Sequence, residues 1–421
     1  MKKTKKGKGS GGGGKAGVVL EQEVQDKAID YIRLRNIDRL NQMLAEGSEE
    51  IHFLNKFHTK LSRTALMIAA EEGYVDGVRA LLDAKAKVQL RELNKEGMTA
   101  FLIAARWGYT NILDYLAQSG AEINDTTNTK KETPLMLACR WGHIDSALYI
   151  ISIEASLHDQ NTSIETALTI SLKYEHFKIS KELLEKGCDI NLQGVNGNTT
   201  LLRSAFDGRD TTVSFILANK GDVSIKNQNG ESAFIIACKH GHTNIAQMLL
   251  DNHAFINDVD NLGRTSLMYA VMNSKVEIVN MLLSMKADVN MVDLYGYGAL
   301  SFACLHKKGL PLVTILLEAG VHIDAMDKSY STALLHACRK GNMEVVEYLV
   351  AKGGANYSLV NIDNHTPLDV CPNEDHKEEF QRIMDKHPLS GRPISYMKKN
   401  PGVKEIPTWV KRINANRLLD I

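Results

Sequence analysis

Two Arg-Trp-Gly triplets are the first residues whose types and spacing suggest chemistry. "ARWGYTNIL" begins at Ala105 and "CRWGHIDSAL" begins at Cys139, so the triplet returns after 34 residues. Arginine and tryptophan are enriched at the energetic centres of protein interfaces, where truncation of such a residue costs about 2 kcal/mol or more. Both pairs are therefore candidates for contacts with a partner.

Two other stretches resemble ligand-binding motifs without completing them. "GSGGGGKA" at 9–16 has the glycines and the lysine of a phosphate-binding loop, but Ala16 supplies no hydroxyl for magnesium and no buried strand precedes the stretch. "KHGH" at 239–242 offers His240 and His242, yet residues two apart do not share a helix face, which favours a structural role over metal binding. The sequence contains no Gly-x-Ser-x-Gly or His-Glu-x-x-His motif. We therefore expect no enzymatic activity and no nucleotide, metal or other cofactor.

Basic and acidic residues balance over the chain, at 50 each, but they are distributed unevenly. Residues 1–20 hold six lysines and no acid, residues 387–421 hold seven basic residues against two acids, and the region between has a net charge of −11. A nucleic-acid groove along this acidic body would need an excess of basic residues. We expect no nucleic acid along the body, whereas the two basic ends are able to meet an anionic surface.

Hydropathy and the first residues bear on the compartment. No stretch approaches the ~20 apolar residues that span a bilayer, and the N-terminal lysines lead into glycines in place of an apolar signal segment. We expect a cytoplasmic protein without a membrane span. A cytoskeletal or ciliary location stays open, and the nucleus is less favoured.

The middle of the chain consists of repeats of 33 to 35 residues. Each begins at a Thr, twice replaced by Ser or Gly, that is followed two residues later by Leu or Phe. The order within a repeat is a turn, a short helix, a glycine and a second helix with paired leucines. Helices this short are unstable alone in water, so each must bury its apolar face against the next repeat, which predicts a solenoid. The repeat starts are Thr64, Thr99, Thr133, Thr166, Thr199, Ser232, Thr265, Gly298, Thr332 and Thr366.

These repeats resemble the ankyrin repeat family. The resemblance is carried by "TALMIAAEEG" at 64, "TPLMLACRWGH" at 133, "TALLHACRKGN" at 332 and "TPLDV" at 366, and it covers about residues 58–386. It implies an all-α fold, an ankyrin-repeat solenoid of about ten helix-turn-helix repeats with β-turn fingers. It also implies a protein-binding role without identifying the partner.

Two departures from the family pattern predict local differences. The family's histidine three residues after the start is replaced in every repeat, so we expect its hydrogen bond to the threonine to be absent throughout. The glycine nine residues after the start, which can end the first helix in a left-handed conformation, is replaced by Glu175, Ser274, Lys307 and Asp375. We expect irregular fourth, seventh and eighth repeats, with a small insertion near Gly309 in the eighth.

The ends of the array carry distinct segments. "AIDYIRLRNIDRLNQMLAEG" from Ala28 has the spacing of a degenerate helix pair, and "HKEEFQRIMDKH" from His376 gives the last repeat a highly charged helix. We divide the chain into a disordered Lys/Gly-rich arm (1–20), an N-terminal helical cap (21–57), the ankyrin array (58–386) and a basic tail containing prolines (387–421). Whether the tail contacts the array or binds elsewhere stays open.

The six cysteines fall at small-residue positions of the repeat. A buried thiol at such a position acts as a small hydrophobe, and reduced thiols agree with an intracellular compartment. We therefore expect a structural role for Cys139, Cys188, Cys238, Cys304, Cys338 and Cys371.

The Arg-Trp pairs occupy positions 7 and 8, counted from the repeat start. The family resemblance implies that these positions face the concave side and contact partners. In the second to fifth repeats an aromatic residue lies at or next to position 8, and a cation precedes each of the first three aromatics. This spacing places one aromatic residue about every 10 Å along the array. Such an arrangement suits an extended acidic or amphipathic peptide; alternatively, the aromatics stack between repeats and stabilise the solenoid. The candidate residues are Arg106, Trp107, Arg140, Trp141, Lys173, Tyr174, Phe206, Lys239, His240, Arg339 and Lys340.

The finger tips supply a second candidate surface. Tyr295 and Tyr297 flank Gly296 in one tip, and Tyr330 lies in the next. The alternative is that these tyrosines pack between fingers. Both readings stay open.

Two functional hypotheses follow. The first is a non-enzymatic scaffold or adaptor that binds a protein partner on the concave ankyrin surface. The second is a structural component of a cytoskeletal or ciliary assembly, anchored through the basic termini, with the Lys-rich arm on an acidic polymer.

Overall fold

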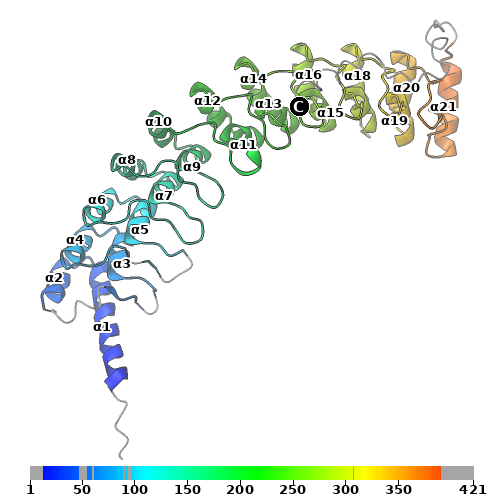
Figure 1. Ribbon diagram of the computed structural model, residues 1–421. Coiled ribbons are helices and arrows are strands. Elements are labelled where there is room, and N and C mark those ends of the chain that lie inside the picture. Colours follow the sequence, from blue (N-terminus) through cyan, green and yellow to red (C-terminus); the bar gives the residue numbers. More distant parts are fainter. Residues whose placement is uncertain are drawn as a thin grey trace, which may run out of the picture. The chain divides into compact units, whose positions relative to one another are not determined.

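The computed structural model describes residues 13–46, 55–58, 61–89, 91–92, 96–306 and 308–389, with the backbone alone for 13–22 and 46 (Figure 1). The chain divides into an N-terminal block, Met1–Asp288, and a C-terminal block, Val289–Ile421. The described backbone of both blocks forms helices, turns and isolated β-bridges, so the fold is all-α. Among these residues, none of the helices has the length and apolar surface that crossing a bilayer requires.

The N-terminal block is a stack of helix pairs. Each inner helix packs on the outer helix of its own repeat and on the inner helices of neighbouring repeats, and the fingers project from the inner row (Figure 1). A short 3-10 helix, η2 (Val195–Gly197), lies in the finger before α11. The inner helices are α1 (Gly13–Arg33), α3 (Ala65–Glu71), α5 (Ala100–Trp107), α7 (Pro134–Trp141), α9 (Ala167–Lys173), α11 (Thr200–Asp207), α13 (Ala233–His240) and α15 (Ser266–Met272). The outer helices are α2 (Ile37–Glu46), α4 (Val75–Asp83), α6 (Thr110–Gln118), α8 (Ile144–Ser152), α10 (Phe177–Glu185), α12 (Asp210–Ala218), α14 (Thr243–Asp251) and α16 (Val276–Ser284).

The C-terminal block continues the same pattern with its own helices. They are α17 (Ala299–Leu305), α18 (Leu310–Glu318), α19 (Ala333–Lys340), α20 (Met343–Tyr348) with the π-helical turn η3 (Leu349–Gly353), and α21 (Glu374–Lys386). The "TPLDV" stretch forms a turn, so the tenth repeat lacks an inner helix. The charged helix predicted there is present as α21, which packs on α20.

The capping pair is formed by α1 and α2. Because α1 begins at Gly13, residues 13–20, which the sequence assigned to a disordered arm, are helical. Residues 1–12 of the arm and 390–421 of the tail lie outside the described part of the chain.

The predicted repeat starts are helix N-caps from Thr64 to Thr332. Each Thr or Ser hydroxyl accepts a hydrogen bond from the backbone N–H three residues later, which satisfies one of the N–H groups left free at the helix start. The reverse bond, expected to be absent throughout, forms in three repeats. The backbone N–H of Thr64 donates to the Met67 sulfur over 3.4 Å. The backbone N–H of Thr166 donates to the Thr169 hydroxyl, and that of Thr366 donates to the Asp369 carboxylate, each over 2.8 Å. A thioether, a hydroxyl or a carboxylate thus takes the place of the histidine of the family pattern.

The expectation of irregular fourth and seventh repeats was wrong. Glu175 and Ser274 adopt the left-handed conformation, with φ of 60° and 53°, and an outer helix follows each of them as in the other repeats. The eighth repeat does differ: α18 begins one residue later in its repeat than α16 does in the seventh, and Pro311 lies in its first turn. The later start of α18 confirms the predicted insertion near Gly309. Lys307 lies outside the described residues.

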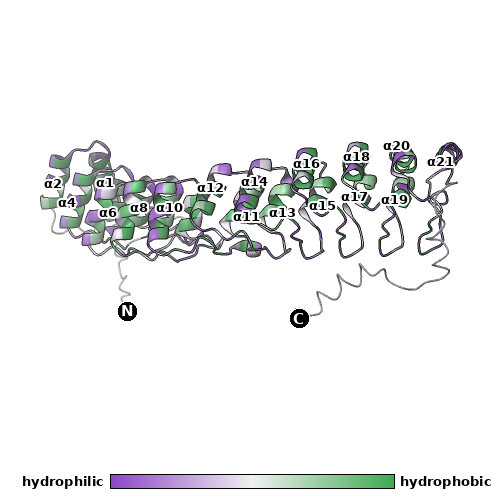
Figure 2. Ribbon diagram, turned by 90° about the horizontal axis from the view of Figure 1, so that it is seen from above, coloured by the Kyte–Doolittle hydropathy of each residue, from purple (hydrophilic) through white to green (hydrophobic). Residues whose placement is uncertain are grey.

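Small and branched apolar side chains fill the contacts between repeats. The buried residues of the inner helices include the Ala, Leu, Ile and Met of each repeat, and Figure 2 shows these helices as mixtures of apolar green and polar purple. All six cysteines are buried and free, as predicted. Burial raises the pKa of the Cys238 thiol to about 12, so this thiol stays protonated at neutral pH.

Asparagines after the outer helices link successive repeats. The side-chain oxygen of Asn191 accepts a hydrogen bond from the Asp222 backbone N–H over 2.8 Å, and the same contact recurs elsewhere in both blocks. Each bond satisfies a loop N–H group that no helix ladder reaches. The other acceptors are Asn55, Asn124, Asn257, Asn290 and Asp324.

Replacing Asn191 by alanine is expected to lower the free energy of unfolding by about 1 kcal/mol, because one hydrogen bond between repeats is lost. Amide hydrogen exchange should show faster exchange at Asp222. Asn191→Asp, which keeps an acceptor oxygen, is the control. Unchanged exchange at Asp222 in the alanine variant would contradict the linking role.

Candidate functional site

The cations at position 7 of the second, third, fourth and sixth repeats form ion pairs inside the array. In the third, fourth and sixth repeats a glutamate one residue before the repeat start, position −1, lies against the basic side chain at position 7. The pairs are Arg140–Glu132, Lys173–Glu165 at 2.6 Å and Lys239–Glu231 at 2.7 Å. Arg106 pairs with Glu96 at 2.8 Å. The cations predicted to meet an acidic peptide are therefore already paired with carboxylates of this chain.

Arg140 also joins two repeats. Its guanidinium donates to the Tyr174 hydroxyl over 2.8 Å and lies 5.4 Å from the centre of that ring. The Glu165 carboxylate of the fourth repeat lies 3.6 Å from the same guanidinium. Arg140 therefore positions Tyr174 in addition to neutralising Glu132.

The ion pairs are reflected in the titration of the glutamates. Burial by itself would raise the pKa of Glu165, but hydrogen bonds from Lys173 and Asn161 outweigh it and hold the pKa below its ordinary value. The pKa of Glu231 is lowered in the same way, by Lys239 and Asn227 against burial. Both carboxylates are thus held in their charged form.

The aromatic side chains, in contrast, remain half-exposed. We call Trp107, Trp141, Tyr174 and Phe206 the aromatic row. Trp107 is 49% exposed and Trp141 is 54% exposed. The row lies at the C-terminal ends of inner helices α5, α7, α9 and α11. Large exposed aromatics on consecutive repeats are a feature that a partner can bind.

Contacts between repeats account for part of this row. Phe206 lies edge-on to His240, with ring centroids 4.5 Å apart. The pKa of His240 is lowered by burial and by the nearby Lys239 and His242, so its imidazole is biased towards the neutral form. Tyr174 receives the cations of Arg140 and Lys173 on its ring. Stacking and exposure therefore coexist at Tyr174 and Phe206.

Side chains at position 10 hold the ends of the preceding inner helices. His143 Nε2 donates to the Arg106 carbonyl over 2.9 Å, and His242 Nε2 donates to the Phe206 carbonyl over 3.2 Å. Arg209 binds the Lys173 carbonyl in the same manner. These bonds fix the backbone that carries the row, and they give His242 the structural role predicted for it. The sequence analysis did not predict that side chains at position 10 bind these helix-end carbonyls, although histidine recurs at this position.

The finger tyrosines differ in their surroundings. Tyr295 and Tyr330 are exposed on neighbouring fingers, which are joined by a bond from the Lys328 N–H to the Tyr295 carbonyl at 2.9 Å. Tyr297 instead stacks on the buried His336, with centroids 5.1 Å apart. The predicted trio thus splits into two exposed residues and one that packs inside the C-terminal block.

Arg339 and Lys340 end helix α19 with exposed side chains. They lie in the C-terminal block, whereas the aromatic row lies in the N-terminal block.

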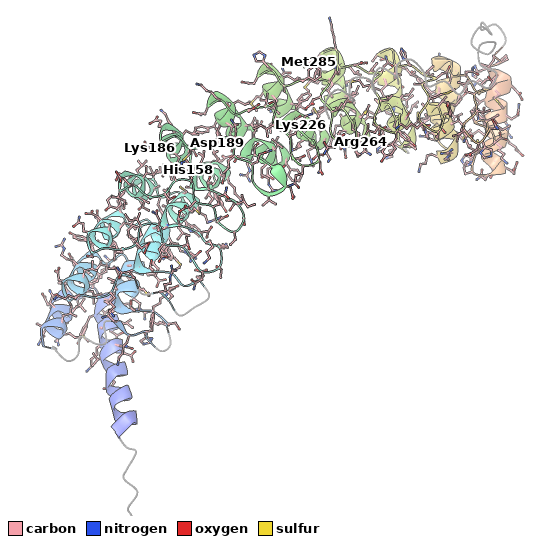
Figure 3. All side chains as sticks on the ribbon, viewed as in Figure 1. His158, Lys186, Asp189, Lys226, Arg264 and Met285 are labelled. Carbon is pink, nitrogen blue, oxygen red and sulfur yellow. The ribbon has the colours of Figure 1, made fainter. Side chains whose placement is uncertain are left out.

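The described residues contain no group of three or more His, Cys, Asp or Glu side chains able to hold a metal ion. A pocket of about 70 Å³ is lined in part by His158, Cys188 and Asp189. Figure 3 labels His158 and Asp189. Pockets for small ligands typically enclose about 300 Å³ or more. This pocket therefore does not fit a cofactor.

These features define an all-α repeat solenoid with an exposed row of aromatics. The model of the family described as ankyrin repeats matches residues 31–127, 124–194, 201–293 and 300–387. The chain therefore belongs to the ankyrin repeat family.

Several relatives share parts of the array. The chain is 29% identical over 161 residues to an ankyrin repeat and KH domain-containing protein, mask-1, of Caenorhabditis elegans, a match that covers 37% of this chain and 6% of that protein. It is 31% identical over 200 residues to the mouse (Mus musculus) protein fem-1 homolog A-like, covering 37% and 31% respectively. The chain thus spans less than a third of either relative.

The crystal structure of the ankyrin repeat domain of Bcl-3 is also similar. It is 26% identical, with a TM-score of 0.47, over 52% of this chain and 98% of that domain.

Proposed function

We propose that this chain is a non-enzymatic scaffold or adaptor that binds an extended or amphipathic segment of a protein partner along the aromatic row. The observation that carries the proposal is the combination of half-exposed Trp107 and Trp141 with neighbouring cations that are already paired. Binding there is driven by apolar contact with the rings. We further propose a cytoplasmic location, which the buried free thiols support.

The second hypothesis, a cytoskeletal or ciliary component anchored through the basic ends, concerns segments that lie largely outside the described residues. It stays a prediction from charge alone. The experiment below separates it from the adaptor function.

The Trp107→Ala/Trp141→Ala variant should lose partner binding while staying folded, because each indole leaves about half of its surface in solvent. Two hot-spot residues account for an affinity loss of at least about 30-fold. Cross-linking mass spectrometry of protein captured from its native cells should find a partner near the second to fifth repeats that is lost in the variant. Circular dichroism checks the fold.

Tyr295→Ala, on a finger of the C-terminal block, is the matched control. It removes a similarly exposed aromatic and should leave the cross-links near the row unchanged. Cross-links that arise only from the basic ends, and that persist in the tryptophan variant, would refute the row as the binding site.

A further inference from the structure

The fifth repeat departs from the others at position 4 of its inner helix. This position is a buried apolar residue in the neighbouring repeats, namely Ile103, Leu137, Ile170 and Ile236. In α11 it is Arg203, whose side chain is 68% exposed. Positions 4 and 7 are three residues apart on the inner helix and share a face, and position 7 of α11 is Phe206 of the aromatic row. Arg203 therefore faces the side on which the aromatic row lies.

The charges around Arg203 leave one cation in excess. Arg203 Nε lies 3.6 Å from the Asp207 carboxylate, but Asp207 also binds Arg209 at 2.8 Å. Position −1, which is glutamate in the third, fourth and sixth repeats, is the neutral Asn198 here. Two arginines thus share one carboxylate, whereas Arg140 and Lys173 in the third and fourth repeats lie against two, Glu132 and Glu165.

Apolar surface flanks this cation. The Arg203 guanidinium lies 5.6 Å from the centre of the half-exposed Phe206 ring. A bound segment at this repeat therefore meets a cation beside an exposed aromatic ring.

We propose that Arg203 is the specificity residue of the row: it binds a carboxylate of the partner segment, an Asp or Glu next to an apolar side chain that contacts Phe206. This rests on the proposed function of the row. Charge complementarity identifies the bound segment, because one excess cation is neutralised by a single acidic residue and does not favour a run of acidic residues. Arg106, Arg140 and Lys173 are already paired with glutamates of this chain and therefore do not favour an acidic residue of the partner.

The test is selection from a phage-displayed library of random linear peptides on the folded full-length chain. The wild type should enrich peptides with one acidic residue next to an apolar residue. Arg203→Glu should enrich a basic residue at the same place. A wild-type peptide should bind Arg203→Glu about tenfold or more weakly, and exchanging its acid for lysine should restore binding.

Two controls separate this inference from the proposed function. Arg382→Glu on α21 reverses another exposed arginine that pairs with a single glutamate, Glu378, and should leave the selected sequences unchanged. Peptides that require Trp107 and Trp141 but show no acidic position, or that bind Arg203→Glu equally well, would overturn the role of Arg203 alone. Failure to enrich any peptide that depends on the tryptophans would overturn the proposed site together with this inference.

Discussion

Replacing Gly142 by alanine is expected to lower the free energy of unfolding by about 2–3 kcal/mol. Gly142 has a φ of 73°, and an added Cβ there would overlap the His176 ring of the next repeat. The left-handed conformation costs a non-glycine residue about 1 kcal/mol, and displacing a packed ring adds a similar amount or more. Denaturant unfolding followed by circular dichroism measures the loss.

Gly120 is the matched control. Its φ is 82°, yet a Cβ there would meet no atom within 4 Å, so Gly120→Ala carries the conformational cost alone. We expect about 1 kcal/mol for this variant. Equal losses for the two glycines would show that the contact with His176 adds nothing.

The same contact accounts for the regular fourth repeat, which lacks the glycine at position 9. At Gly73 and Gly108 a ring at position 10 of the next repeat, Tyr109 or His143, lies where a Cβ would be, and at Gly241 the Lys275 side chain lies there. After Glu175 the next repeat has Arg209, whose side chain turns to the Lys173 carbonyl instead. The Glu175 carboxylate then accepts hydrogen bonds from Thr211 and Thr212. The requirement for glycine depends on a residue one repeat further on.

The sequence predicted the fold well because the repeat phase is set by local chemistry. A threonine that caps a short helix and a buried small residue six places later are both readable from residue types, and Thr133 and Cys139 have the predicted roles. The tenth repeat shows the limit: Thr366 makes the capping contacts with Asp369, but a turn follows in place of an inner helix. A capping signal alone does not produce a helix.

The site was predicted less completely because exposure and pairing depend on neighbouring repeats. The glutamates at position −1 are visible in the sequence eight residues before each cation, yet their contact depends on the finger folding back over the inner helix. Once paired, Arg140 and Lys173 no longer distinguish an acidic ligand. Arg203 was overlooked because position 4 is ordinarily core, and only its exposure reveals it.

The Arg-Trp pair of the third repeat is expected to separate into two roles. Arg140→Met should lower the free energy of unfolding by about 3 kcal/mol, because it leaves the Glu132 carboxylate, 6% exposed, without its partner. Arg106→Met is the matched control: Arg106 and Glu96 are both more exposed, and such a pair contributes about 1 kcal/mol or less. Trp141→Ala should instead weaken partner binding with a smaller change in stability. Denaturant unfolding of the three variants provides the comparison, and an equal loss for Arg140→Met and Arg106→Met would refute a structural role specific to Arg140.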